Sequence, residues 1–273
     1  MKYLTIITIT TFFLLIISCE KVIEIDLPGN EPALVIEGYL EKDSLCVVQL
    51  SSTIDIFDGK TPDFITDAVI TISDNQGTTE TLLYQDFGRY KGTLLRGQIG
   101  NTYTLSVQVN NQEYKASSTI LSAVPIDSIQ VKEGSDIIFI GAGGEDYKSV
   151  YVHYTDPSTT PNNYLLKFLY IPNSNNDNAY SLDRTYLRND DNKNGLPDSA
   201  FLFSQPLQTG DIIIAELRSI DQAVFDYYFS IEDALVGNSF TSAAPANPKS
   251  NFSNGALGYF GAWSKEVEFF VVP

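Results

Sequence analysis

The chain has 273 residues, and its 34 Asp and Glu outnumber 17 Lys and Arg, which gives a formal net charge of −17. Nucleic-acid binding requires basic patches that neutralise phosphates, so this balance argues against a nucleic-acid partner. It also argues against a surface that lies flat on anionic lipid. The length suits two domains of ordinary size, which can bury sizeable cores without disulfide staples.

The first 18 residues have the features of a bacterial lipoprotein signal peptide. Lys2 supplies a short positive region, and residues 4–17 are an uninterrupted run of Leu, Ile, Phe and Thr. That run is shorter than the roughly 20 residues that a membrane-spanning helix needs. Residues 15–19 (LIISC) then resemble the lipobox, in which aliphatic residues and a small residue precede an obligatory cysteine.

The lipobox predicts cleavage before Cys19 and a covalent lipid on its thiol. Several acyl chains on one cysteine anchor a protein to a membrane stably, whereas a single chain does not. Residues 19–32 would then form a lipid-anchored tether, mixed in charge and ending in turn residues. An ordinary secretory signal that happens to contain a cysteine is the alternative.

The few cysteine and histidine residues limit the chemistry open to the chain. With Cys19 lipidated, Cys46 has no disulfide partner within the chain, and its apolar surroundings predict a buried small residue. His153, the single histidine, argues against a zinc site, and no Gly-x-Ser-x-Gly turn presents a serine nucleophile. We therefore expect a protein that is not an enzyme, with a hydrolase acting on nutrient polymers as an alternative.

The chain after the tether predicts a mostly β protein in two parts. Residues 33–124 should form an N-terminal sandwich with an immunoglobulin-like or transthyretin-like plan, because short alternating runs are separated by turn signals. Pro125 enforces extended geometry, so we place a boundary near residue 124. The strands expected in this part are 33–40, 45–52, 67–73, 78–84, 103–109 and 112–120.

Residues 125–273 should form a second β-rich domain with a helix near 221–236. Apolar residues recur at close to helical spacing in that segment, Ser219 or Asp221 can cap its start, and Gly237 can end it. The strands expected around it are 137–140, 148–154, 164–170, 200–203, 211–219, 257–263 and 266–272.

The sharpest chemical motif is DDNKNGLPD at residues 190–198, which is similar to the short calcium loops of thrombospondin-type and dockerin-type repeats. Calcium prefers six to eight oxygen ligands, and a glycine permits the tight curl that brings them together. The possible ligands are the side chains of Asp190, Asn192, Asn194 and Asp198 and the carbonyl of Leu196. The alternative is a plain hairpin turn with Asn-Gly at its tip. If calcium binds, we expect it to order the loop.

Aromatic residues are abundant, with 16 Tyr, 16 Phe and one Trp. Tyr259 and Trp263 could line a ligand or partner surface near the C-terminus. Phe260 between them is better explained as core, since aromatic strand residues pack inside.

Four segments together resemble the family named domain of unknown function 4249, common in Bacteroidota. Their order and spacing carry the resemblance more than any one segment does. They are residues 19–28 (CEKVIEIDLP) with 34–38 (LVIEG), 68–74 (AVITISD) with 100–105 (GNTYTL), 124–129 (VPIDSI), and 247–252 (NPKSNF) running into 255–262 (GALGYFGA).

The resemblance implies an outer-membrane lipoprotein, and family members commonly sit beside TonB-dependent outer-membrane transporters. We therefore expect a non-enzymatic binding or accessory subunit that works with such a transporter in nutrient uptake on an unknown small-molecule or polymer ligand. A surface adhesion or structural lipoprotein is the alternative. The acidic pattern after Cys19 only partly matches a surface-export signal, so either face of the outer membrane stays open.

Overall fold

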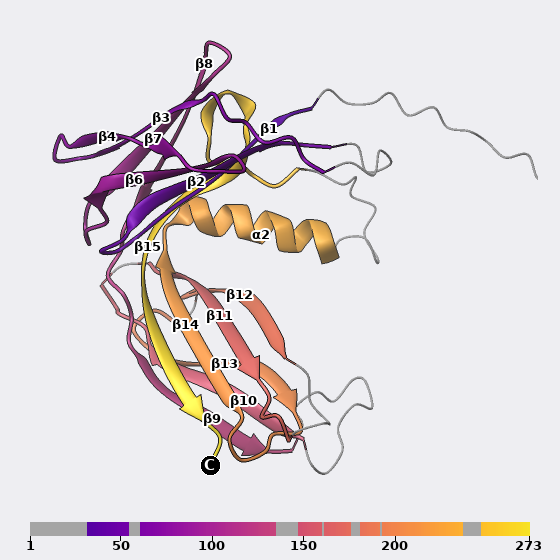
Figure 1. The fold of residues 1–273 in the computed structure, drawn as a ribbon. Coiled ribbons are helices and arrows are strands. Elements are labelled where there is room, and N and C mark those ends of the chain that lie inside the picture. Colours follow the sequence, from indigo (N-terminus) through magenta and orange to yellow (C-terminus); the bar gives the residue numbers. More distant parts are fainter. Residues whose placement is uncertain are drawn as a thin grey trace, which may run out of the picture. The chain divides into compact units, whose positions relative to one another are not determined.

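The computed structural model shows a mostly β chain, as the sequence predicts (Figure 1). It describes residues 32–54, 61–134, 147–159, 161–175, 181–191, 193–236 and 247–273. The segment expected to be a signal peptide, Cys19, most of the segment expected to be a tether and the strand expected at 137–140 lie outside these ranges. Residues 32–273 form one compact unit by their contacts. No helix among the described residues has the length and apolar character needed to cross a membrane.

The elements of the first half are strands. They are β1 Leu34–Glu41, β2 Leu45–Ser52, β3 Val69–Asp74, β4 Thr79–Thr81, β5 Leu83–Tyr84, β6 Arg89–Arg96, β7 Thr102–Val109 and β8 Gln112–Thr119. The second half contains β9 Ile126–Glu133, β10 Lys148–Thr155, β11 Asn163–Ile171, β12 Leu182–Asn189, β13 Pro197–Gln205, β14 Ile212–Ile220, α2 Gln222–Val236, the 3-10 turn η1 Ser253–Gly255 and β15 Leu257–Val271.

In the described part of the chain these strands form three sheets. The largest has eight strands in the order β12-β11-β14-β15-β1-β2-β6-β5. A four-stranded sheet, β4-β3-β7-β8, packs against its β1 and β2 strands in one apolar core. A three-stranded sheet, β13-β10-β9, packs against β11 and β14 in a second core.

The long strand β15 belongs to both of these sandwiches. Residues 257–263 pair in parallel with β1, and residues 264–271 pair antiparallel with β14. Side chains alternate between the faces of a strand. Phe260 and Ala262 accordingly enter the first core and Phe270 packs on the second, whereas Trp263 points to the face that α2 covers. The two strands expected at 257–263 and 266–272 are therefore one continuous strand.

The predicted boundary near residue 124 falls between the two cores in sequence. The first core draws on residues 36–120 and 252–262, and the second on residues 124–217 and 272. Because β15 serves both, residues 32–273 remain one contact unit, and the division into two domains stays a prediction.

Helix α2 begins where the sequence predicts, with Asp221 as its cap. One carboxylate oxygen, Oδ1, accepts a hydrogen bond from the backbone N–H of Val224 at 3.0 Å, which satisfies a donor of the first turn. The other, Oδ2, accepts from the Ser118 hydroxyl at 2.6 Å, and that hydroxyl oxygen accepts from the N–H of Ala262 at 2.8 Å. Asp221 and Ser118 thus tie the start of α2 to β8 and to β15.

Several strands were missed or misplaced, and each has a physical reason. The polar strands β9 and β12 lie at sheet edges, so their alternation is weak. The strand expected at 78–84 is divided into β4 and β5, which pair in different sheets. Strand β6 lacks regular alternation because it contains a bulge.

The bulge in β6 is stabilised by Glu80 of the facing sheet. Lys91 pairs with Val47 and Arg96 pairs with Leu45, so four residues of β6 lie opposite one residue of β2. The Glu80 carboxylate accepts hydrogen bonds from the backbone N–H groups of this segment, at 2.9 Å from Leu94, at 2.7 Å from Leu95 and also from Thr93.

These hydrogen bonds decide the charge state of Glu80, which is only 8% exposed. Burial alone would raise the pKa of its carboxyl group. The hydrogen bonds from Leu95, Thr93 and Leu94 outweigh that effect and hold the pKa below its ordinary value. Glu80 is therefore a charged acceptor. It takes the place of the acceptors on β2 with which the bulged residues would form hydrogen bonds in a regular sheet.

The close approach of β15 to β1 depends on Gly258, which gives a first prediction. Gly258 has φ +88°, and a Cβ there would lie 2.1 Å from the carbonyl oxygen of Ile36. Gly255 has φ +79° and nothing within 4 Å of its added Cβ. Gly258→Ala is expected to lower the free energy of unfolding by about 3 kcal/mol, and Gly255→Ala by about 1 kcal/mol. Chemical denaturation measures both, and equal losses would contradict the packing argument.

A second prediction concerns Glu80→Gln. It should lower the free energy of unfolding by about 2–3 kcal/mol near neutral pH, because charged acceptors make the stronger hydrogen bonds. The folded-state pKa is depressed, so this contribution is complete above the unfolded-state pKa of about 4.3 and is lost as the pH falls through the folded-state value. Urea denaturation across that range should show the difference between wild type and variant narrowing in acid.

Glu113→Gln is the matched control for Glu80→Gln, because Glu113 is a half-exposed carboxylate on β8 that pairs with Lys115 at 2.8 Å. We expect its stability to stay close to wild type. Two results would show that the Glu80 carboxylate does not stabilise the bulge. One is a Glu80→Gln variant as stable as Glu113→Gln, and the other is a difference in the free energy of unfolding between wild type and Glu80→Gln that does not change with pH.

Candidate functional site

The segment predicted as a calcium loop connects β12 to β13. These strands belong to different sheets, so they do not form a hairpin. The turn predicted at Asn194 and Gly195 is nevertheless present, because the N–H of Leu196 donates to the carbonyl of Lys193 at 2.9 Å. Gly195 has φ +76°, and a Cβ there would lie 2.5 Å from Cβ of Ser158, so both conformation and packing require glycine. The segment is therefore a close-packed connection between two sheets.

Most of the oxygen atoms predicted to bind calcium accept hydrogen bonds from N–H or O–H groups of the chain itself. Asp190 Oδ2 accepts from the N–H of Asn162 at 2.9 Å, and the Leu196 carbonyl accepts from the N–H of Asp156 at 3.2 Å. Asp198 accepts from the Tyr154 hydroxyl at 3.0 Å and pairs with Lys193. Asn194 is exposed, and Asn192 lies outside the described residues. Within the described ranges, no three His, Cys, Asp or Glu are grouped to hold a metal ion. Calcium binding stays a prediction.

Asp156, which was not among the residues predicted from the sequence, supports this segment. It is 4% exposed and accepts from the Tyr164 hydroxyl and, at 2.9 Å, from the N–H of Gly195. Burial, and then the hydrogen bond to Asp156, raise the pKa of Tyr164 well above its ordinary value. The Asp-Pro pair at 156–157, one residue beyond the strand predicted at 148–154, was the available signal for this turn.

The aromatic pair predicted as a ligand or partner surface lies mostly under α2. Trp263 is 2% exposed, and its ring stacks on Tyr39 with centroids 5.8 Å apart. The Tyr259 hydroxyl lies 2.9 Å from that of Tyr228 on α2. Burial raises the pKa of Tyr259, and it raises that of Tyr227 to about 12. A molecule that binds on this face of the sheet would therefore contact Tyr39, which is 40% exposed, and not the buried Trp263.

Charged side chains beside Trp263 form a connected group. Lys265 lies 3.1 Å from a Glu41 oxygen and 3.2 Å from a Glu216 oxygen, and Arg218 pairs with Glu216. The indole N–H of Trp263 donates to Glu41 at 3.3 Å. Burial would raise the pKa of Glu216, but Arg218 and Lys265 outweigh it and lower the pKa. Both carboxylates are therefore paired with cations.

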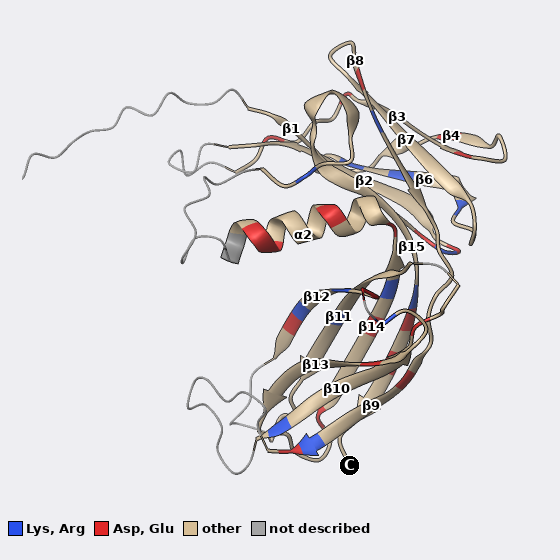
Figure 2. Ribbon diagram, turned by 180° about the vertical axis from the view of Figure 1, so that it is seen from behind, with Lys and Arg blue, Asp and Glu red and all other residues tan. Residues whose placement is uncertain are grey.

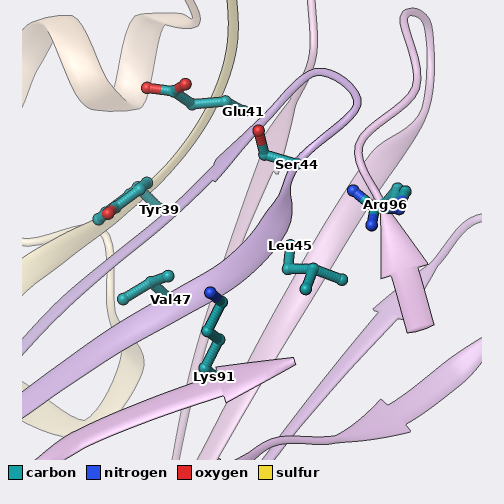
Figure 3. A pocket seen from close by; sticks show the side chains of 7 residues that line it. All are labelled: Tyr39, Glu41, Ser44, Leu45, Val47, Lys91 and Arg96. Carbon is teal, nitrogen blue, oxygen red and sulfur yellow. The ribbon is translucent and has the colours of Figure 1, made fainter. Parts of the chain in front are cut away.

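A pocket of about 460 Å³ opens beside Tyr39 on the same face of the eight-stranded sheet (Figure 3). Lys91 and Arg96 from β6 supply two cationic groups, and in Figure 3 the Lys91 amine points into the space between Val47 and Leu45. Strand β6 carries Arg89, Lys91 and Arg96 and no acid, in contrast to α2, which carries only acids (Figure 2). The residues that line the pocket are Tyr39, Glu41, Ser44, Leu45, Val47, Lys91 and Arg96.

These lining residues suit binding better than bond breaking. Glu41, the acid among them, is held by Lys265 and Trp263, and Ser44 has no histidine beside it in the lining. Cys46 is fully buried, and burial raises the pKa of its thiol, so it is no nucleophile for this pocket. His153 lies on β10 and contacts Gln130 at 3.0 Å. The pocket can hold an anion but presents no activated nucleophile.

A second pocket, of about 420 Å³, lies between α2 and the β12–β13 connection. Its lining mixes charges of both signs, including Arg188, Asp191 and Lys193, with the exposed ring of Phe229. Lys193 already pairs with Asp198 there. The pocket beside Tyr39 is therefore the stronger candidate, since its cations have no such acidic partner among the described residues.

Tyr39, Lys91 and Arg96 were not among the site residues predicted from the sequence. Lys91 and Arg96 are five positions apart, which places them on opposite faces of a regular strand. Tyr39 reads as an ordinary member of an alternating strand. The one usable signal was the composition of β6, whose cations stand out in an acidic chain.

Comparisons with known proteins give a family but no activity. Two solved structures of a pullulanase from Anoxybacillus sp. LM18-11, one complexed with maltotriose, align at TM-scores of 0.21 and 0.20 with 8% and 10% identity. Each alignment covers 67% of this chain and 24% of the enzyme, so the chain spans about a quarter of those proteins. Similarity at this level carries no argument about function. Curated proteins gave no significant match.

The family model named domain of unknown function DUF4249 matches residues 20–268. That range includes all of the strands from β1 to β14, helix α2 and most of β15. The chain therefore belongs to the DUF4249 family, as the sequence segments predict.

Proposed function

We propose that the protein is a lipid-anchored, non-enzymatic binding or accessory subunit of the outer membrane that works with a TonB-dependent transporter in nutrient uptake. The observation that carries the binding role is the open pocket beside Tyr39. It presents two cations, a hydroxyl and an exposed aromatic ring, without a nucleophile and base in reach of each other. Such a lining can retain a ligand and release it unchanged.

The anchor and the partner have separate support. The hydrophobic run before Cys19 and the lipobox support lipidation, which would hold the folded unit beside a membrane by its tether. The transporter is the partner that the sequence resemblance to the DUF4249 family implies, and the chain belongs to that family. Calcium, if it binds residues 190–198, would order the connection between β12 and β13.

A pull-down from detergent-solubilised membranes tests the proposed function. The tagged full chain should recover an outer-membrane β-barrel transporter, and mass spectrometry should find the mature N-terminus at a lipid-modified Cys19. Cys19→Ala is the control, because it removes the lipid and leaves residues 32–273 unchanged. We expect it to recover the transporter several-fold less well, since tethering to one membrane raises the effective concentration.

Two results would count against the proposal. One is an unmodified N-terminus together with no barrel recovered under any growth condition that expresses the protein. The other is a deletion strain that loses attachment to surfaces while nutrient uptake is unchanged, which would favour an adhesion or structural lipoprotein instead.

A further inference from the structure

We propose that the pocket formed by β1, β2 and β6 binds a small carboxylate-bearing ligand that also has a flat apolar ring. The inference rests on the proposed binding function and names its ligand class, but it does not depend on the lipid anchor or on the transporter. It is carried by the placement of Lys91, Arg96 and Tyr39 on one face of the sheet (Figure 3).

The bulge in β6 is what brings the two cations together. Val47 and Leu45, their partners on β2, are two positions apart and share a face. Lys91 and Arg96 are five positions apart and would face opposite ways in a regular strand. The inserted residues, held by Glu80, restore Arg96 to the face of Lys91. The structure thus uses a buried carboxylate to present two cations at one opening.

The cations of the pocket lack acidic partners within the described chain. No described Asp or Glu forms a salt bridge with Lys91 or Arg96, although acids outnumber cations two to one. One Arg96 nitrogen, Nη1, donates to the carbonyl of Asp43 at 2.7 Å, which orients the guanidinium. The other N–H groups of the guanidinium take no part in that hydrogen bond. Glu41, the acid in the lining, already forms a salt bridge with Lys265. An anionic ligand would supply the counter-charge.

The geometry favours a carboxylate on a ring over a simple ion. Tyr39, Val47 and Lys91 lie side by side on adjacent strands, so a flat group stacked on Tyr39 can place its anion at Lys91. Tyr39 is itself fixed by stacking on Trp263. The planar guanidinium of Arg96 matches the two oxygens of a carboxylate. Leu45 and Val47 add apolar contact beneath such a ring.

The open shape of the pocket sets the expected affinity. Its volume of about 460 Å³ lies within the range of small-ligand sites, but a ligand there stays partly in contact with water. We therefore expect a Kd on the order of 0.1–1 mM for a minimal probe. A natural ligand that fills more of the pocket would bind more tightly.

Benzoate is a suitable probe, and Trp263 is a built-in reporter. It is the one tryptophan of the chain and lies against Tyr39, so a ring stacked on Tyr39 should change its fluorescence. The full chain in a non-ionic detergent is titrated with benzoate, with benzamide as the neutral comparison and with inorganic phosphate as the anion that lacks a ring. We expect a saturable response to benzoate and at least tenfold weaker binding of the other two.

Three variants assign the response to the pocket. Lys91→Met and Arg96→Met should each weaken benzoate binding about fivefold, and Tyr39→Leu about threefold. Lys115→Met is the matched control, because Lys115 is a half-exposed cation on β8 that pairs with Glu113. It should bind benzoate as wild type does. Thermal unfolding of each variant verifies that it is folded, and the benzoate-induced rise in Tm provides a second measure of binding.

Distinct results would overturn the inference. Equal responses to benzoate and benzamide would show that the cations do not recognise the carboxylate. Phosphate binding as tight as benzoate binding would show that the ring of the ligand adds no affinity. Wild-type affinity in folded Lys91→Met and Arg96→Met variants would place the site elsewhere. If the pull-down recovers no transporter but benzoate still binds, only the proposed transporter partnership is contradicted. If the transporter is recovered but benzoate does not bind, only the proposed ligand class is contradicted.

Discussion

The pairing of β15 with two different neighbours is the constraint on which the rest of the structure depends. Its first half continues the sheet through β1, and its second half continues it through β14. Each half also sends side chains into one of the two apolar cores. Burial of apolar surface is the main stabilising term in both, so neither core is complete without this strand. The Ser118–Asp221 contact adds a polar link at the same place, between β8, β15 and α2.

The candidate pocket inherits its geometry from this arrangement. Tyr39 and Glu41 are presented by β1, whose partner on one side is β15. Glu41 is held by Lys265, which follows the point where β15 changes partner, and Trp263 fixes Tyr39 from beneath α2. The other wall, with Lys91 and Arg96, depends on a carboxylate from the facing sheet. A site on one strand face thus depends on contacts from both sheets of the first sandwich and from β15.

Local patterns in the sequence were enough to predict much of this fold. Alternating residues marked β1, β2, β7 and β8, and Asp221 followed by a helical apolar period marked α2, because these signals lie within a few neighbouring residues. The family was likewise predicted from short segments. The bulge in β6 could not be predicted, since it depends on Glu80, whose contact with Leu95 appears only in three dimensions. The same holds for Asp156 and for the burial of Trp263 under α2.

Native-state hydrogen exchange tests most directly whether β15 makes residues 32–273 one cooperative unit. The slowest amides of β7, in the first core, and of β11, in the second, should report the same opening free energy, because neither core persists without the shared strand. They should also lose protection together as denaturant is added. Two clearly different free energies, with β11 amides still protected where those of β7 exchange freely, would contradict the account.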